Sequence, residues 1–150
     1  MPNPTFRRLN EGWNAEPNAP HPQVLVSGSD ILVEFFLSPF QFQQFDPEDR
    51  GILRFVDCSR YRLGGTNDEG WYLGQCRYSK IAPAWGEFYE ISGTDSHLDQ
   101  PDDWKTVSET SSASRHFLFY FRDETFECIA SSWEFESKSA NALFQNFKAR

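Results

Sequence analysis

The stretch RHFLFYFRDETFECIASSWEF, residues Arg115–Phe135, decides the fold. It contains two apolar and aromatic runs, His116–Phe121 and Phe126–Ala130, on either side of the polar segment Arg122–Thr125. Aromatic runs of this length around a short polar turn are typical of a β-hairpin. The segment Trp133–Glu136 then predicts a third short strand.

The alternation within these runs predicts which residues share a face. A four-residue turn would put Phe121 opposite Phe126, and the pattern then gives one wholly apolar face. Its members are Phe117, Phe119, Phe121, Phe126, Cys128 and Ala130. The other face is mixed, and we expect it to be half solvated. Its members are His116, Leu118, Tyr120, Arg122, Thr125, Glu127 and Ile129.

Length, composition and charge narrow the class of protein. A chain of 150 residues is the size of one domain, and the 17% of aromatic residues can build a core from few side chains. The net charge of −8 argues against nucleic acid and anionic membranes as partners. No apolar stretch has the ~20 residues of a membrane span, and we identify no secretory signal at the N-terminus.

The three cysteines, Cys58, Cys76 and Cys128, cannot all pair with one another, and none lies in a CxxC motif. Buried thiols in a reduced compartment explain this pattern. We therefore expect a cytoplasmic protein.

The rest of the chain is rich in strand and turn signals. Residues Met1–Pro22 contain five prolines and predict an extended arm. We expect Phe6, Leu9 and Trp13 to pin this arm to the body. Further strands are predicted at Val24–Ser27, Ile31–Leu37, Gly51–Leu63 (one long strand or two short ones, with Arg54, Arg60 and Arg62 projecting outward), Trp71–Tyr78 and Gly86–Ile91.

Two polar or amphipathic segments complete the fold prediction. Ser92–Ser114 predicts a long surface loop, and the tail Ser137–Arg150 predicts one short helix. Many short strands with at most one helix predict a mainly β protein, a single-domain antiparallel sandwich or barrel. An α+β arrangement, with the helix packed on a curved sheet, is the alternative.

Catalytic and cofactor motifs are not found in this sequence. It contains no GxxxxGK[ST], GxGxxG, GxSxG or HExxH pattern, so we predict no cofactor. In the hairpin, His116 and Cys128 point to opposite faces, which argues against a Cys–His pair. The aspartates of the loop, Asp95, Asp99, Asp102 and Asp103, match no cation-binding loop and indicate a solvated segment.

The best candidate for a binding rim is the turn-rich region between Arg62 and Arg77. Polar turn residues there alternate with arginines and aromatics, a combination common at binding sites. The predicted ligand-binding residues are Arg62, Asn67, Asp68, Glu69, Trp71, Arg77, Trp85 and His116. Turn capping and packing explain the same residues without a ligand.

Four blocks of the sequence carry a resemblance. They are GWNAEPNAP (Gly12–Pro20), YRLGGTNDEGWYLGQCR (Tyr61–Arg77), APAWGEFYEISG (Ala82–Gly93) and RHFLFYFRDETFECIA (Arg115–Ala130). Together they cover about a third of the chain and resemble a family of small bacterial proteins with no assigned activity. The resemblance implies no catalytic residue and no cofactor.

Three functions are compatible with the sequence. The first is a non-enzymatic protein that presents an acidic surface to a basic protein partner, for example an immunity protein against a basic toxin. The second is a small-ligand binder lined by Trp71, Trp85, Phe88 and Tyr89. The third is an enzyme, which requires at least two of His116, Glu69, Asp68, Arg62 and Cys76 to converge in one cleft. The dispersed histidines favour binding over catalysis, and the sequence leaves the oligomeric state open.

Overall fold

The computed structural model of the chain describes residues 4–64, 84, 86–93, 103–122 and 124–139. These residues form ten strands. In chain order they are β1 (Thr5–Arg8), β2 (Gln23–Ser27), β3 (Asp30–Phe36), β4 (Arg50–Val56), β5 (Arg60–Gly64), β6 (Phe88–Ser92), β7 (Lys105–Thr106), β8 (Arg115–Tyr120), β9 (Thr125–Ala130) and β10 (Ser132–Lys138).

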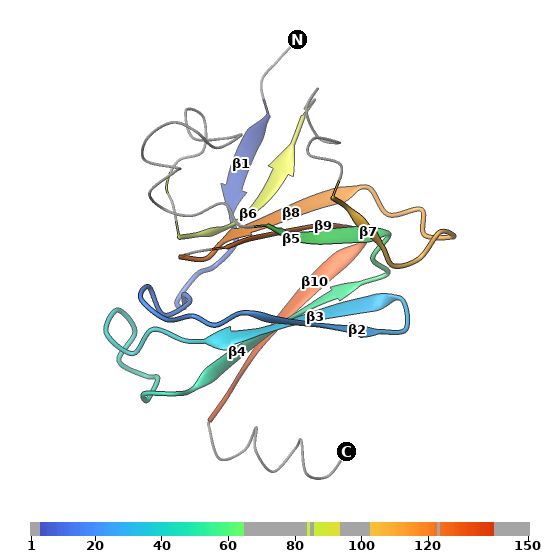
Figure 1. The fold of residues 1–150 in the computed structure, drawn as a ribbon. Helices are drawn as coiled ribbons and strands as arrows, with labels where there is room; N and C mark the ends of the chain where they lie inside the picture. The colour runs from blue at the N-terminus through green and yellow to red at the C-terminus, as the bar shows by residue number, and fades with distance from the viewer. Residues whose placement is uncertain (1–3, 65–83, 85, 94–102, 123, 140–150) are drawn as a thin grey trace.

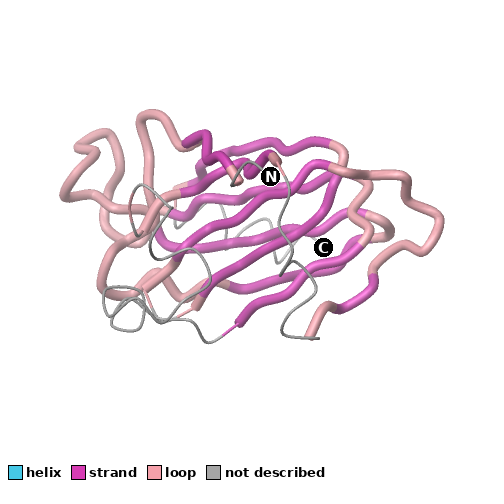
Figure 2. The backbone as a smooth tube through the Cα atoms, turned by 90° about the horizontal axis from the view of Figure 1, so that it is seen from above, coloured by secondary structure: helices cyan, strands magenta, loops and turns pink. Residues whose placement is uncertain are grey.

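The strands form two antiparallel sheets. A six-stranded sheet has the order β1-β6-β8-β9-β5-β7, and a four-stranded sheet has the order β10-β4-β3-β2. The six-stranded sheet lies above the other in Figure 1, and the described loops gather at the two ends of the strands in Figure 2. The prediction of a mainly β, antiparallel protein is confirmed.

Burial alternates strictly along β3 and β4. In both strands every second residue is buried, as expected where one sheet face meets a core. The predicted inward set of β3, Ile31, Val33 and Phe35 with Leu37 just beyond it, is fully confirmed. Gly51 of β4 is also required on this face, since a Cβ there would lie 2.8 Å from the ring of Phe35.

Aromatic rings from both sheets meet in one core. The Phe55 ring of β4 lies 5.9 Å from that of Phe88 and 5.4 Å from that of Phe117, and Phe35 lies 5.3 Å from Phe119, each measured between centroids. Such pairs contribute about 0.5–1.5 kcal/mol each beyond the area that they bury. The apolar face of the predicted hairpin belongs entirely to this core.

The register of the hairpin differs from the prediction by two residues. Phe119, rather than Phe121, lies opposite Phe126, and the ladder continues to Tyr120 opposite Thr125. Phe121 N–H still donates to the Glu124 carbonyl at 2.9 Å, so the turn is shorter than four residues. Because the shift is an even number, every side chain keeps its predicted face.

The second face of the hairpin is buried, which contradicts the prediction that it is half solvated. His116, Leu118, Tyr120, Glu127 and Ile129 are all at least nine-tenths buried on this outer face of the six-stranded sheet. Of the predicted outer set, Arg122 at the turn is exposed and Thr125 is partly exposed, and the other five residues are removed from water. His116, a member of this face, is hydrogen-bonded to Glu127 and only 8% exposed.

Of the two alternatives predicted for Gly51–Leu63, the two short strands are confirmed, and these strands belong to different sheets. The chain leaves β4 at Asp57, whose φ of 51° is unusual for a residue other than glycine. The Asp57 N–H donates to the Asp30 carboxylate at 3.0 Å, and the Ser131 hydroxyl donates to the Asp57 carboxylate at 3.0 Å. These contacts hold the corner from which β5 enters the other sheet.

The N-terminal arm is pinned by the predicted side chains, but it also contributes a strand. Trp13 is 5% exposed and stacks on Phe135 with ring centroids 3.9 Å apart, while Leu9 and Phe6 pack on the buried clusters. Strand β1 pairs with β6, which alternation alone did not indicate.

Several predicted elements fall outside the described residues. They are the strand Trp71–Tyr78, most of the C-terminal helix, and much of the Ser92–Ser114 loop. Residues Ser137 and Lys138, assigned to that helix, belong to β10, and Lys105 and Thr106 of the loop form β7. No membrane-spanning helix is found in the described part of the chain.

Candidate functional site

Two of the eight predicted ligand-binding residues, Arg62 and His116, lie in the described part of the chain. The structure brings both to the outer face of the six-stranded sheet, where a third residue, Glu127, joins them. The other six predicted residues, Asn67, Asp68, Glu69, Trp71, Arg77 and Trp85, lie outside the described residues, as does Cys76.

Arg62, Glu127 and His116 form a buried charge network across three neighbouring strands. Arg62 of β5 lies directly opposite Glu127 of β9, and its Nε and Nη2 atoms donate to Glu127 Oε1 at 3.0 and 2.9 Å. His116 Nε2 of β8 contacts the other carboxylate oxygen, Oε2. The three side chains are between 4% and 9% exposed, so water contributes little to their solvation.

The guanidinium of Arg62 also contacts the segment that precedes β7. Its Nη1 donates to the Asp103 carboxylate at 3.1 Å, and its Cζ atom lies 4.2 Å from the centre of the Trp104 ring. Arg60 also lies over Trp104, at 4.5 Å. The prediction that Arg60 and Arg62 project from the outer face is confirmed in direction, but Arg62 is buried beneath Asp103 and Trp104.

The chemistry of this network is mutual charge neutralisation. Both oxygens of Glu127 accept hydrogen bonds, and a buried carboxylate needs such partners to remain ionised. Glu127 was not among the predicted site residues, although a charged residue in the middle of the apolar strand TFECIA signals a buried partner. The network joins β5, β9 and β8, and its three side chains are almost fully buried.

Metal and thiol chemistry receive no support from the described residues. They contain no group of His, Cys, Asp or Glu side chains that would hold a metal ion, and Asp103 of the acidic loop pairs with Arg62. Cys58 and Cys128 are fully buried in the core. A hydrogen bond with Cys128 lowers the pKa of Cys58, while burial raises the pKa of Cys128.

Phe88 and Tyr89 do not line one ligand pocket. They point to opposite faces of β6, and both are buried, Phe88 in the core between the sheets and Tyr89 on the outer face. Burial raises the pKa of Tyr89 to about 12. Its hydroxyl donates to the Ala84 carbonyl at 3.0 Å and accepts from the Ala84 N–H at 3.1 Å.

A pocket of about 350 Å³ lies between the N-terminal arm, the start of β6 and the tip of the β8–β9 hairpin. Polar side chains predominate in its wall. The lining residues are Asn14, Ala15, Glu16, Pro17, Asn18, Gln41, Gly86, Glu87, Tyr120, Phe121 and Arg122. The volume is at the lower end of the range for ligand sites, which suits one side chain or a small molecule.

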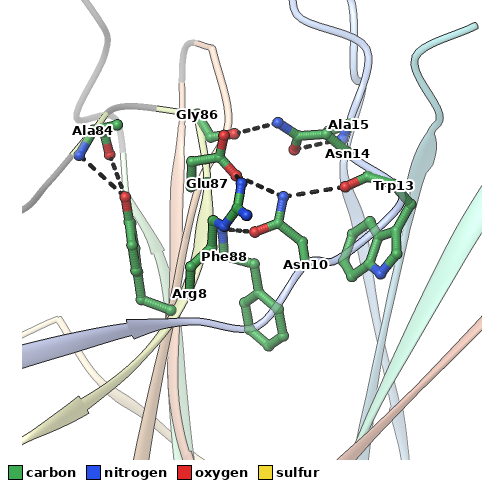
Figure 3. A network of polar contacts seen from close by, with 10 residues as sticks. Arg8, Asn10, Trp13, Asn14, Ala15, Ala84, Gly86, Glu87 and Phe88 are labelled. Carbon is green, nitrogen blue, oxygen red and sulfur yellow. Dashed lines mark hydrogen bonds and ion pairs between the residues drawn. The ribbon is translucent and has the colours of Figure 1, made fainter. Parts of the chain in front are cut away.

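A hydrogen-bonded network builds the wall of this pocket (Figure 3). Asn10, only 2% exposed, donates from Nδ2 to Glu87 Oε2 at 2.6 Å and to the Trp13 carbonyl at 3.1 Å, and its Oδ1 accepts from the Phe88 N–H. Asn14 donates to the Gly86 carbonyl at 2.8 Å. Two asparagines therefore fasten the arm to β6 and fix the orientation of Glu87.

The electrostatic character of the pocket is acidic. Glu87 Oε2 lies 3.9 Å from Arg8 Nη1, whereas Oε1 has no polar partner among the described residues. The Glu16 carboxylate accepts the Asn18 and Ala19 N–H groups at 3.0 and 2.6 Å. Arg122 Nη1 donates to the Asn18 carbonyl at 3.2 Å. The lining thus carries two carboxylates and one guanidinium.

This pocket was not predicted from the sequence. The only available signal was the placement of Asn10 and Asn14 around the anchoring Trp13, in an arm whose prolines prevent helix formation. Comparison with known proteins adds no candidate: no family model, curated protein or solved structure matches the chain. The Arg62–Glu127–His116 network and the pocket beside Glu87 are therefore the two candidate sites for function.

Proposed function

We propose that the protein is a non-enzymatic binding protein that recognises a basic side chain of a protein partner in the pocket beside Glu87. One observation carries the proposal. Glu87 is held in a fixed orientation by buried Asn10, with one carboxylate oxygen left for a ligand, at the wall of an open pocket. A preoriented acceptor avoids the entropic cost of ordering the side chain on binding.

The charges of the pocket favour a cation. Glu16 and Glu87 line it with two negative charges and Arg122 with one positive charge, while Arg8, outside the lining, approaches Glu87 Oε2 at 3.9 Å. A lysine or arginine side chain would pair with Glu87 Oε1, and its charge-assisted hydrogen bond there would be shorter and stronger than a neutral one. Arg122 and the lining amides would suit the backbone of the same partner residue.

The charge of the whole chain supports the same partner. A net charge of −8 accelerates association with a basic protein and repels acidic ones. An immunity protein that inhibits a basic toxin is one form of this function. The free, buried thiols of Cys58 and Cys128 agree with a cytoplasmic location, and the proposed scaffold is a β-sandwich.

The binding function is preferred over catalysis because the candidate catalytic groups bind one another. Arg62 and His116 converge, as an enzyme would require, but both contact Glu127 in a buried network rather than in a cleft. A general base must reach a substrate proton directly or through one water molecule. The described arrangement of Glu127 and His116 offers no such approach.

The test is affinity purification from the cytosol of the source cell with three forms of the protein. Glu87→Gln removes the charge and keeps the amide oxygen that Asn10 needs. Glu109→Gln removes one charge from an exposed residue in the turn that follows β7, which does not line the pocket, so both variants have a net charge of −7.

We expect the wild type and Glu109→Gln to recover a basic partner, and raised salt to reduce that recovery. Glu87→Gln should recover no partner. Equal recovery with both variants would refute the role of the pocket. Recovery of no partner at low salt would refute the function.

A small basic molecule is the second candidate ligand, since the pocket volume of about 350 Å³ admits one. A thermal-shift series with free lysine, arginine and their N-acetylated amides separates the two functions. Millimolar or weaker binding of the amides alone indicates recognition within a polypeptide. Tight binding of a free molecule that is abolished by Glu87→Gln would indicate a small-ligand binder.

A further inference from the structure

Strand β2 is an edge of the four-stranded sheet, and it carries two of the three exposed large apolar side chains of the described chain. β3 is its neighbour in that sheet on one side, and no described strand pairs with the other side. Among the described residues, the exposed large apolar side chains are Leu25 at 53%, Val26 at 50% and Phe40 at 78%. Two of these three lie next to each other on β2.

The hairpin geometry shows which backbone groups of β2 face outward. β2 and β3 are joined by the two-residue turn Gly28–Ser29, with Gly28 at a φ of 63°, and the register puts Leu25 opposite Leu32. In such a hairpin, alternate residues bond to the partner strand, starting next to the turn. Leu25 therefore bonds toward β3, while the N–H and C=O groups of Val24 and Val26 point away from the sheet.

The other strand edges of the described chain carry protection that β2 lacks. Edge strands are commonly guarded by charged residues, prolines or short length. β10 carries Glu134, Glu136 and Lys138, β1 carries Arg7 and Arg8, and β7 has two residues. The segment from Pro22 to Ser29, PQVLVSGS, contains no charged side chain, and its one proline precedes the strand.

We propose that β2 is a self-association edge, where a second copy of the chain pairs antiparallel through its own β2. With Leu25 on the two-fold axis, Val24 of one protomer lies opposite the partner's Val26, and the reverse. The outward N–H and C=O groups of these residues then bond to each other. Two four-stranded sheets become one continuous eight-stranded sheet.

The sequence of β2 fits a second copy better than an unrelated strand. A two-fold axis at Leu25 pairs Val24 with the partner's Val26, so each cross-strand contact joins valine to valine or leucine to leucine and no charged residue is buried. The Leu25 pair is a non-hydrogen-bonded pair, in which opposing side chains approach most closely. The two Leu25 side chains would extend the apolar row that Leu25 forms with Leu32 on each outer face.

The absence of charge on β2 makes it the edge strand best suited to a second copy, compared with β1, β7 and β10. Two molecules that each carry a charge of −8 repel one another, and neutral β2 lets them meet without placing carboxylates in contact. Salt should therefore strengthen self-association, whereas it weakens binding of a basic partner. One strand pair is a small interface, so we expect a weak, concentration-dependent dimer. The inference does not rest on the proposed function.

The experiment is sedimentation equilibrium over a concentration series at low and raised salt. Leu25→Lys puts two ammonium groups against each other on the axis. Phe40→Lys is the matched control, because it also replaces an exposed apolar residue with a lysine, away from β2. We expect the wild type and Phe40→Lys to dimerise with rising concentration and salt, and Leu25→Lys to remain a monomer.

Amide hydrogen exchange gives a second readout that does not depend on any variant. In the wild type, exchange at Val24 and Val26 should slow by at least several-fold as concentration rises, while exchange at Leu25, already bonded to β3, should not change. A wild type that stays monomeric throughout, or a Leu25→Lys variant that dimerises like the wild type, would overturn the proposal. Slower exchange at Leu25 rather than at its neighbours would overturn the register.

Discussion

Both faces of the β8–β9 hairpin are largely buried, but the inner face is wholly apolar, whereas the outer face also buries charged side chains. On the inner face, rings such as Phe117 and Phe119 pack against the second sheet. On the outer face, Glu127 and His116 are buried with Arg62 in a network of charges. The inner face needs only volume and shape, whereas the outer face needs each charge to keep its partner. We therefore expect the two faces to differ in the substitutions that they tolerate.

The largest expected effect comes from breaking the outer network at its centre. Glu127→Ala removes the carboxylate that both Arg62 and His116 contact, and it leaves a buried positive charge poorly compensated. We expect a loss of about 3–5 kcal/mol in the free energy of unfolding, measured by chemical denaturation. Glu134→Ala on exposed β10 is the control and should change stability by no more than about 0.5 kcal/mol. A similar small effect at Glu127 would refute the network's importance.

The next largest effect tests the shape requirement of the inner face. In Gly51→Ala, the new Cβ would lie 2.8 Å from ring atoms of Phe35 and 2.9 Å from the ring of Phe135. Relieving this contact should cost about 1–3 kcal/mol by chemical denaturation. Gly64→Ala serves as the control because no atom lies within 4 Å of its added Cβ. If both glycine variants are equally stable, the packing at Gly51 is looser than described.

A smaller effect contrasts the buried network with an ion pair at the rim. Arg115 donates to Glu90 at 2.8 and 2.9 Å, and these hydrogen bonds lower the pKa of Glu90. A carboxylate with a lowered folded-state pKa stabilises the fold above its unfolded pKa, and this contribution disappears as the pH falls through the folded value. Glu90→Gln should therefore cost about 1 kcal/mol at neutral pH, and this cost should shrink as the pH falls through the lowered folded-state pKa of Glu90. A gap between variant and wild type that widens in acid would contradict this assignment.

The smallest expected effect tests most directly whether the outer face needs its charges. Replacing the whole network with apolar residues, Arg62→Met, His116→Phe and Glu127→Leu together, converts the outer face to the chemistry of the inner one. Buried ion networks are often no more stabilising than well-packed apolar replacements. The triple variant should therefore unfold within about 1 kcal/mol of the wild type and be far more stable than Glu127→Ala. A triple variant as unstable as Glu127→Ala would show that the charges stabilise the fold beyond mutual neutralisation.

The inner face was predictable from the sequence because alternation reports which side of a strand each residue occupies. Phe117, Phe119, Phe121 and Cys128 all face the core as predicted. Alternation fixes only whether a register is even or odd, so the hairpin prediction was wrong by two residues without misplacing any side chain. The sequence left open whether Gly51–Leu63 is one strand or two, because Asp57 adopts a positive φ at the break without a glycine or proline to mark it.

The candidate sites were harder to predict because they depend on contacts between distant segments. Arg62 and His116 were selected for their polarity, but Glu127, 65 residues from Arg62, was assigned to a half-solvated face. Its burial depends on neighbours that the periodicity of β9 does not reveal. The pocket combines Asn14, Glu87 and Arg122 from three segments, and Asn14 and Glu87 become neighbours only after β1 pairs with β6.

The assignment of strands to sheets has a consequence for how the chain folds. The four-stranded sheet takes β2, β3 and β4 from the first third of the chain and β10 from its end, while the six-stranded sheet takes β1 and the strands between. Ser132 of β10 pairs with Val56 of β4, so closing this sheet requires the strands of the other sheet to be looped out or already in position. Such non-local pairing slows folding, typically to milliseconds or seconds. Neither sheet is a continuous piece of sequence, so we expect both sheets to unfold in a single cooperative transition. A substitution at Glu127 or Gly51 should then lower the stability of both sheets together.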